Sequence, residues 1–413
     1  MTDNAAGARR LLIRDLEQVA TPRAGGDRPL RGRALGDVEV VEDGYILCAD
    51  GRIEDVGPMR RLRPLGGEVR ELDGSGRCAI PGLVDCHTHA CFAGDRVEEF
   101  ALRASGVTYE ELHATGGGIL STVRATRAAG EEGLRYAVEL HREWMLQAGT
   151  TTFEAKSGYG LDRDTELASL RAIRAAGGAP TFLGAHAVPP EFGDADAYLD
   201  FVLAEVLPEA ATLADAADVF VERGAFNPDQ ARRYLVTARA AGLRLRVHGD
   251  QFTELGAVGL AIEVGAASID HLEATGADGI RALAASNVAA VMLPASALFL
   301  ARPMPPARAL VDAGAAVALA TDFNPGSAFC ESLPLTCSLA CSQLRLSPAE
   351  ALSACTVNAA AVVGRADRKG RVAAGYDADV VLLDAPDWRY LAYHLGGDVV
   401  STVVKGGEPV WQR

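Results

Sequence analysis

The sequence predicts an α/β protein in which a (β/α)8 TIM barrel is joined to a small discontinuous β-sandwich domain built from both chain ends. Two observations support this prediction. Eight short apolar runs alternate with helix-like stretches between residues 78 and 367, as expected for parallel strands that are covered by helices. The two ends of the chain instead alternate apolar and polar residues with a period of two, which is typical of half-buried strands.

The chain ends read as β-structure. Residues 37–58 alternate in this way and contain two Asp-Gly pairs, which predict a β-meander. The stretches "GRVAAGYDADVVLLDAP" and "VVSTVVKGGEPVW" have the same character. We therefore predict three segments: 1–77 and 368–413 as the two parts of the sandwich domain, and 78–367 as a metal-dependent barrel.

The eight apolar runs each end in a polar residue. In chain order they are "PGLVDCHTH", "GTTTFEAKSG", "APTFLGAHAV", "DAADVFVERG", "LRLRVHGDQ", "AASIDHLEA", "NVAAVMLPAS" and "AVALATDFNP". The stretches between them, such as "TELASLRAIRAAG", have helical spacing and close on glycine. A last helix is predicted from Ser347, where Pro348 and Glu350 complete a capping-box pattern.

The connection after the first run is longer than the others. Residues 97–130 fill it with helix-like sequence and a glycine triplet at 116–118. An insertion at the strand ends of a barrel is a candidate lid over the site. The triplet lacks the G-x-x-x-x-G-K-[ST] pattern of a phosphate-binding loop, so that interpretation is set aside.

Composition narrows the partners. Forty basic and fifty-five acidic residues give a net charge of −15, which disfavours nucleic acid and anionic membranes. The N-terminal stretch has only a three-residue apolar run, so we expect no signal peptide, and no stretch has the ~20 apolar residues of a membrane span. The eight cysteines form no C-x-x-C pair. We expect a cytoplasmic protein with reduced thiols that acts on a small molecule.

Histidines gather at the predicted strand ends. His87 and His89 are two residues apart, so they project from the same face of the first strand. His186, His248 and His271 end the third, fifth and sixth runs, and Asp322 ends the eighth. The remaining histidines, His113, His141 and His394, lie in helical or terminal segments and receive no role.

This set of residue types indicates metal-dependent hydrolysis. Neutral imidazoles and one carboxylate suit Zn²⁺ or an iron ion. Such an ion lowers the pKa of bound water from about 15.7 to about 7, so hydroxide becomes available at neutral pH. Asp322 can accept the proton of that water and pass it to a leaving nitrogen. The predicted outcome is cleavage of a carbon–nitrogen bond at a carbonyl-like centre.

Longer motifs carry a resemblance. "PGLVDCHTH", the later histidines and "ATD" resemble the amidohydrolase superfamily of metal-dependent barrel hydrolases. "HTHACFAGDRVEEF", "GGGILSTVRATRAA", "EAKSGYGLD", "FLGAHAVPPE", "ATDFNPGS" and "YLAYHLG" are similar to the imidazolonepropionase family. The likeness runs from about residue 37 to the C-terminus. It implies hydrolysis of 4-imidazolone-5-propanoate to N-formimidoyl-L-glutamate in histidine degradation.

The resemblance also implies roles for individual residues. Zinc or iron would be held by His87, His89, His248 and Asp322. Substrate contacts would fall on Arg96, Tyr159, His186, Gln251, Asn324, Gly326 and Ser327. His271 would lie near the attacked carbonyl and share catalysis with Asp322. Since relatives are commonly dimeric, a homodimer is also expected.

The residues themselves leave alternatives open. Arg96 can clamp a propanoate carboxylate bidentately, or it can pair with Asp95 or Glu98. Tyr159 lies between two glycines on a loop that could close on a ligand, or it is an ordinary loop aromatic. The turn at Gly326 can bring backbone N–H groups towards a ligand, or it is a turn alone. For Lys156 we favour an ion pair with Glu154 and no site role.

Gln251 separates two enzyme classes. Many deaminating relatives carry a glutamate three residues after the histidine of the fifth strand, whereas this chain has an amide that cannot shuttle protons. This disfavours a heterocycle aminohydrolase, although another cyclic amidohydrolase remains an alternative. A third alternative, a barrel that has lost activity and serves as a scaffold, is disfavoured by the intact set of metal-ligand residues.

Overall fold

The computed structural model describes residues 10–24, 28–106 and 117–413. The chain divides into two compact units. One unit comprises Met1–Asp85, Met145–Thr152 and Ser332–Arg413, and the other comprises Cys86–Trp144 and Phe153–Glu331. Residues 107–116 of the predicted insertion, with His113, lie outside the described residues.

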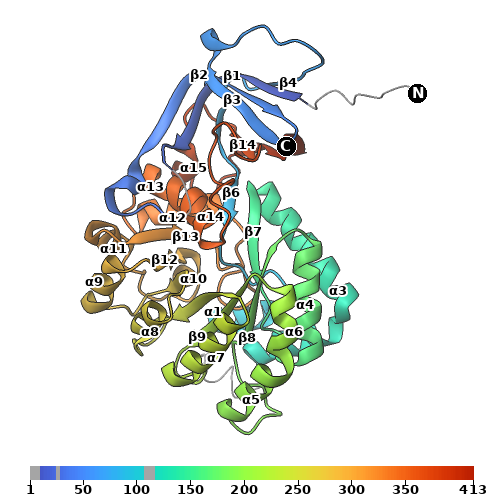
Figure 1. Cartoon of the computed structure of the whole chain (residues 1–413), viewed down its shortest axis with the longest axis vertical. Helices are drawn as coiled ribbons and strands as arrows, with labels where there is room; N and C mark the ends of the chain where they lie inside the picture. Colours follow the sequence, from blue (N-terminus) through green and yellow to red (C-terminus); the bar gives the residue numbers. More distant parts are fainter. Residues whose placement is uncertain (1–9, 25–27, 107–116) are drawn as a thin grey trace. The chain divides into compact units, whose positions relative to one another are not determined.

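The predicted barrel is confirmed as an eight-stranded sheet whose strands follow one another in chain order (Figure 1). Its strands are β6 (Leu83–Asp85), β7 (Thr150–Lys156), β8 (Ala179–Ala185), β9 (Ala216–Val221), β10 (Arg244–Gly249), β11 (Ser268–His271), β12 (Ala289–Met292) and β13 (Ala316–Leu319). The segments that follow the first and last strands pair in parallel through Thr88 and Phe323. His89 N also donates to Phe323 O at 2.9 Å. These bonds join the two edges at the end of the strands where the histidines lie.

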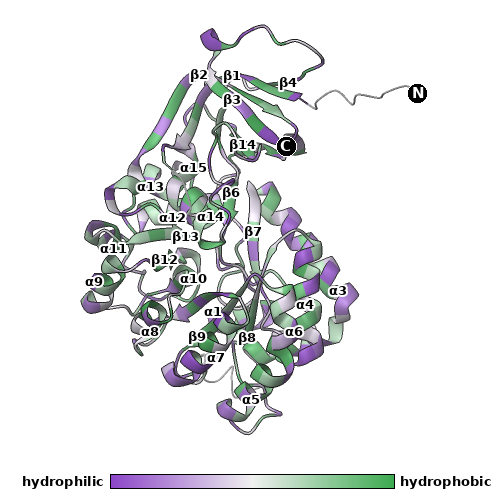
Figure 2. Cartoon of the chain, in the orientation of Figure 1, coloured by the Kyte–Doolittle hydropathy of each residue, from purple (hydrophilic) through white to green (hydrophobic). Residues whose placement is uncertain are grey.

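Helices connect successive barrel strands. They are α1 (Val97–Ala104), α3 (Ile119–Gln147), α4 (Arg163–Ala175), α5 (Ala195–Phe201), η3 (Val202–Val206), α6 (Leu207–Leu213), α7 (Pro228–Ala240), α8 (Ala257–Glu263), α9 (Ala277–Ala285), α10 (Pro294–Phe299) and α11 (Ala307–Ala313). α4 packs on β8, and α7 packs on β9. Figure 2 shows hydrophilic and hydrophobic segments alternating along α3, as expected for a helix with one polar face.

The second sheet is built from both chain ends, as predicted. Its strands are β1 (Arg10–Pro22), β2 (Val38–Ala49), β3 (Arg52–Pro58), β4 (Arg70–Asp73), β5 (Cys78–Pro81), β14 (Val380–Leu383), β15 (Val400–Lys405) and β16 (Glu408–Gln412). The ends meet where β5 pairs parallel to β1 and antiparallel to β14. Two short 3-10 helices, η1 (Gly32–Gly36) and η2 (Met59–Arg61), accompany these strands.

Strand β1 and the first Asp-Gly pair differ from the sequence-based expectation. β1 was not predicted because its apolar residues do not alternate. Ile13 packs into one hydrophobic cluster and the adjacent Leu12 into another, so both faces of the strand are covered. The pair Asp50–Gly51 forms the β2–β3 turn with positive φ at both residues, whereas the pair at 43–44 lies inside β2.

The predicted capping box at Ser347 is present. The Ser347 hydroxyl accepts from Glu350 N at 3.2 Å, and the Glu350 carboxylate accepts from Ser347 N at 2.7 Å. The helical stretch continues through α13 (Pro348–Ser353), η4 (Ala354–Asn358) and α14 (Ala359–Val362). The same unit contains α12 (Leu333–Ser342) and α15 (Tyr390–Tyr393). In the described ranges, none of the helices has both the length and the apolar character needed to cross a membrane.

Candidate active site

Four buried side chains converge at the strand ends of the barrel. His87 and His89 follow β6, His248 belongs to β10, and Asp322 follows β13. The Nε2 atoms of His89 and His248 are 3.3 Å apart. Asp322 Oδ1 lies 3.5 Å from His89 Nε2 and 3.6 Å from His87 Nε2. The structure therefore brings together all four residues that were predicted to hold a metal.

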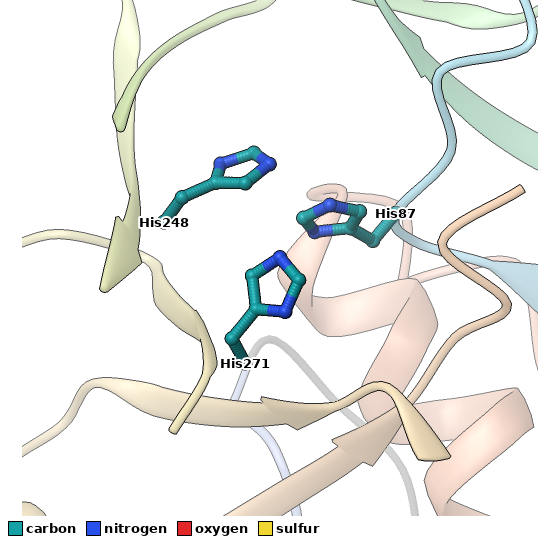
Figure 3. A group of neighbouring side chains, drawn as sticks. All are labelled: His87, His248 and His271. Carbon is teal, nitrogen blue, oxygen red and sulfur yellow. The ribbon is translucent and has the colours of Figure 1, made fainter. Parts of the chain in front are cut away.

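A fifth side chain, His271, reaches the same place from the end of β11. Figure 3 shows its ring together with those of His87 and His248. Single ligand atoms of these three residues lie within 4.8 Å of one another, and the same is true of His87, His89 and Asp322. His271 is thus close enough to contact either a bound ion or the group that reacts beside it.

Carboxylates on the far side of two rings determine which nitrogen faces the centre. His87 Nδ1 lies 2.6 Å from Asp270 Oδ2, and His248 Nδ1 lies 3.0 Å from Asp218 Oδ2. A carboxylate partner places the imidazole proton on Nδ1 and leaves the lone pair on Nε2. His87 and His248 therefore direct lone pairs into the centre.

The donor set fits one divalent metal ion. Burial lowers the pKa of both His87 and His89, and neighbouring positive groups such as Lys156 lower it further, so these rings are neutral. Imidazole lone pairs crowded against the Asp322 carboxylate repel each other unless a cation lies between them. Burial also raises the pKa of Asp322, against the attraction of His271, and a bound cation would favour the carboxylate form.

The backbone at this centre adopts unusual conformations. φ is +84° at His271, +72° at Leu272 and +57° at Asp322, in the left-handed region that non-glycine residues rarely adopt. Burial lowers the pKa of His271, but Glu273, whose Oε1 lies 3.5 Å from His271 Nδ1, together with Asp322 and Asp270 raises it overall. His271 can therefore hold a proton, unlike the neutral rings opposite it.

Five fully buried charged residues lie beside the histidines, and we call them the charge cluster: Glu154, Lys156, Asp218, Arg246 and Asp270. Lys156 Nζ lies 2.8 Å from Glu154 and 3.0 Å from Asp218, so the favoured ion pair is present. Arg246 lies 3.2 Å from Glu154 and 2.9 Å from Asp270. Since Asp218 and Asp270 contact His248 and His87, the cluster connects two of the four predicted ligands through charged contacts.

A cavity of about 460 Å³ opens beside this centre. Its lining includes His89, His248, His271 and Asp322, together with every predicted substrate contact: Arg96, Tyr159, His186, Gln251, Asn324, Gly326 and Ser327. His186 Nδ1 donates to Gly158 O at 2.9 Å. Burial lowers the pKa of His186 to about 3, so its ring is neutral and its Nε2 remains an acceptor.

Arg96 and the loop 324–327 meet at one wall of the cavity. Arg96 Nε donates to Thr122 Oγ1 at 2.9 Å, while Asp95 accepts from Val97 N. A Cβ added at Gly326 would lie 2.9 Å from Arg96 Cζ, so the guanidinium packs against the glycine. Asn324 Oδ1 accepts from Gly326 N at 2.8 Å and from Ser327 N at 2.7 Å. These N–H groups thus hold the loop, and Gly326 makes room for Arg96.

Sequence reasoning missed Asp218, Asp270, Arg246 and Glu273. It also missed Glu166, a buried residue of α4 whose carboxylate accepts from backbone N–H groups next to Tyr159. The i, i+2 spacing of strand residues was the available signal for part of the cluster. Arg246 precedes His248 by two positions, and Glu154 precedes Lys156 by two, so each pair faces the same side. Because Arg246 lies on the same face of its strand as the predicted ligand His248, it could have been assigned to the barrel interior from the sequence.

The fold and the site define a metal-dependent hydrolase barrel. The amidohydrolase family model matches residues 78–410, and the chain belongs to this family. Solved structures with the same fold include a zinc-bound adenosine deaminase from Xanthomonas campestris, with a TM-score of 0.71, 20% identity and coverage of 97% of this chain and 92% of that one. The guanine deaminase of E. coli gives a TM-score of 0.74 at 16% identity, with 98% and 99% covered.

More similar relatives narrow the family. The imidazolonepropionase of Rubrobacter xylanophilus is 62% identical over 406 residues, covering 96% of this chain and 97% of the relative. That of Chloroflexus aggregans is 48% identical, with 97% and 98% covered. Within the amidohydrolases, the chain therefore groups with the imidazolonepropionases.

Proposed function

We propose that this protein hydrolyses 4-imidazolone-5-propanoate to N-formimidoyl-L-glutamate. One observation carries the proposal: three of the four predicted metal ligands, His89, His248 and Asp322, line the same cavity as an arginine, Arg96. A substrate with a reactive ring at one end and an anionic tail at the other matches that combination. The imidazolonepropionases that resemble this chain over nearly its whole length support the same substrate.

The cavity provides a place for each end of the substrate. Arg96 offers a guanidinium to the propanoate, and Gly326 leaves the space in which that guanidinium lies. His186 presents Nε2 as an acceptor, which suits a ring N–H. Gln251, with its amide in the cavity lining, can hydrogen-bond the ring but cannot exchange protons.

One zinc or iron ion would be held by His87, His89, His248 and Asp322. When bound, such an ion supplies Lewis acidity that activates water and polarises a carbonyl. The charge cluster keeps the His87 and His248 rings in the ligand tautomer. Both zinc and iron accept this donor set.

Asp322 and His271 divide the proton chemistry. Asp322 takes a proton from the attacking water and returns it to the ring nitrogen as the carbon–nitrogen bond opens. His271, which Glu273 keeps able to hold a proton, donates a hydrogen bond to the oxygen where negative charge develops. The products are consistent with addition of one water across the cyclic carbon–nitrogen bond.

We also infer that the protein acts in the cytoplasm. All eight cysteines are free thiols, which suits the reducing cytoplasm. The homodimer expected from the resemblance stays a prediction.

Freshly generated imidazolonepropanoate tests the function directly. Mixed with the metal-loaded protein, it should lose its ultraviolet absorbance, and mass spectrometry should identify N-formimidoyl-L-glutamate. Asp322→Asn is the control and should lose at least about 10³-fold in kcat, since it removes a metal ligand and the proton carrier together. Ammonia release from a purine or pyrimidine, with imidazolonepropanoate left intact, would contradict the proposal and favour an aminohydrolase.

A further inference from the structure

The loop 157–161, between β7 and α4, carries Tyr159 into the cavity, and one buried carboxylate binds three of its N–H groups. Arg127 Nε also donates to Gly160 O at 2.6 Å, and Ser157 N donates to Thr181 O at 3.0 Å. Glu166 is 1% exposed and accepts from three backbone N–H groups of this loop. Gly158 N donates to both oxygens, at 3.0 and 2.9 Å. Gly160 N and Leu161 N donate to Oε1 at 2.8 and 2.9 Å.

Local geometry makes this arrangement specific. Gly158 has φ +104° and Leu161 has φ +53°, so the loop turns twice through the left-handed region. A Cβ at Gly160 would lie 3.0 Å from Glu166 Oε1, and one at Gly158 would lie 2.8 Å from Leu183 O. The two glycines flanking Tyr159 thus let the backbone close around the Glu166 carboxylate.

The same loop also fixes His186. Gly158 O accepts from His186 Nδ1 at 2.9 Å, which determines the tautomer of that ring. The rings of Tyr159 and His186 have centroids 5.4 Å apart, and Tyr159 also lies 5.8 Å from His89. Two predicted substrate contacts therefore depend on one loop, and Glu166 binds the three N–H groups of that loop that surround Tyr159.

Capping of α4 does not account for Glu166. The helix already has its N-cap, because Asp162 Oδ1 accepts from Thr165 N at 2.8 Å. Glu166 lies one residue further into the helix, and its carboxylate turns to the loop. Its oxygens are occupied by backbone N–H groups, so it acts through the residues that it positions and not on substrate directly.

We propose that Glu166 is a positioning residue for substrate binding, which holds Tyr159 and, through Gly158, His186 in place. This inference rests on the proposed function for its choice of substrate. It predicts that changes at Glu166 raise KM and leave metal binding and kcat nearly intact. A merely structural role would lower stability without this selective rise in KM.

Glu166→Ala and Glu166→Gln test the proposal with imidazolonepropanoate as substrate and zinc as the metal probe. Glu166→Ala should raise KM about tenfold with kcat within about threefold, and Glu166→Gln, which keeps one acceptor oxygen, about threefold. Zinc content should stay at that of the unmodified protein. Glu350→Ala is the matched control: this carboxylate is also buried and accepts a backbone N–H, in the capping box of α13, and its loss should leave KM unchanged.

A mutant cycle tests whether Glu166 affects KM through Tyr159 and His186. If Glu166 acts through the loop, Glu166→Ala should add less than about twofold to KM once Tyr159 and His186 are both alanine. Full additivity of the effects would overturn the proposal.

Hydrogen exchange of the Gly158, Gly160 and Leu161 amides gives a readout that needs no substrate. These amides should exchange at least about tenfold faster in Glu166→Ala. Failure of the unmodified protein to turn over imidazolonepropanoate would count against the proposed function alone, since exchange still reports on the loop. Faster exchange with unchanged KM, or loss of zinc, would overturn the positioning role. If Glu166→Ala does not fold, Glu166→Gln decides by the same criteria.

Discussion

The charge cluster and the two cavity loops, 157–161 and 324–327, organise the same site in different ways. In the cluster, buried side chains on four strands pair charge with charge, and Lys156 touches two carboxylates at once. In each loop, backbone N–H groups converge on one side chain, Glu166 or Asn324. The cluster adjoins the predicted metal ligands, whereas the loops adjoin the predicted substrate contacts.

This difference predicts which measured property a substitution in each region should change. Removing one member of a buried ion pair leaves its partner charged and unpaired, which is costly for the whole fold. Changing a loop contact disturbs a few local hydrogen bonds. We therefore expect changes in the cluster to alter stability and metal affinity, and changes in the loops to alter KM.

The largest effect is expected for Lys156→Met. Without the ammonium, Glu154 and Asp218 face each other with less compensation, and the free energy of unfolding should fall by about 3–5 kcal/mol. Because Asp218 then holds His248 less well, zinc affinity should fall roughly 10–100-fold. Urea unfolding and competition with a chromophoric chelator measure the two quantities.

Arg171→Met is the matched control for that change. Arg171 pairs with Glu131 at 2.7 Å, but both side chains are about half exposed, so the loss should cost less than about 1 kcal/mol. Equal losses in the two variants would remove the distinction between a buried cluster and an ordinary surface pair.

An intermediate effect is expected for Gly326→Ala. The new methyl group collides with the Arg96 guanidinium, so KM should rise about tenfold, in the direction of Arg96→Ala, with zinc affinity unchanged. Gly259→Ala is a suitable control. Gly259 lies in helix α8, and a Cβ added there meets open space. An unchanged KM in Gly326→Ala would place the propanoate away from Arg96.

The smallest effect is expected in the pH dependence of kcat/KM when His186 is changed. The pKa of His186 is lowered to about 3, chiefly by burial, and a lowered pKa favours the neutral ring, so His186 should stay neutral from pH 5 to 9. His186→Asn should therefore lower kcat/KM without moving the inflections of its pH profile. Disappearance of an inflection near pH 6–7 in the variant would show that His186 titrates there.

The barrel strands and the rim histidines could be predicted because parallel strands of a barrel present their ends to one face. Asp322, His248 and the His87–His89 pair follow directly from that rule. Within the charge cluster, the Lys156–Glu154 ion pair was predicted from the sequence. Asp218 and Asp270 were not, since they lie inside apolar runs and depend on strand neighbours distant in sequence.

Glu166 and strand β1 could not be predicted for similar reasons. Glu166 looks like one of the acidic residues that favour a helix N-terminus, and only the folded loop shows what it binds. β1 was missed because a strand covered on both faces loses the alternation by which strands are recognised. Nothing local in the sequence distinguishes such positions from ordinary ones.

Anomalous diffraction from zinc-loaded crystals tests the central claim most directly. We predict one strong peak within about 2.0–2.2 Å of nitrogens of His87, His89 and His248 and an oxygen of Asp322. A peak bound elsewhere, or one that takes His271 as a ligand in place of His89, would contradict the account.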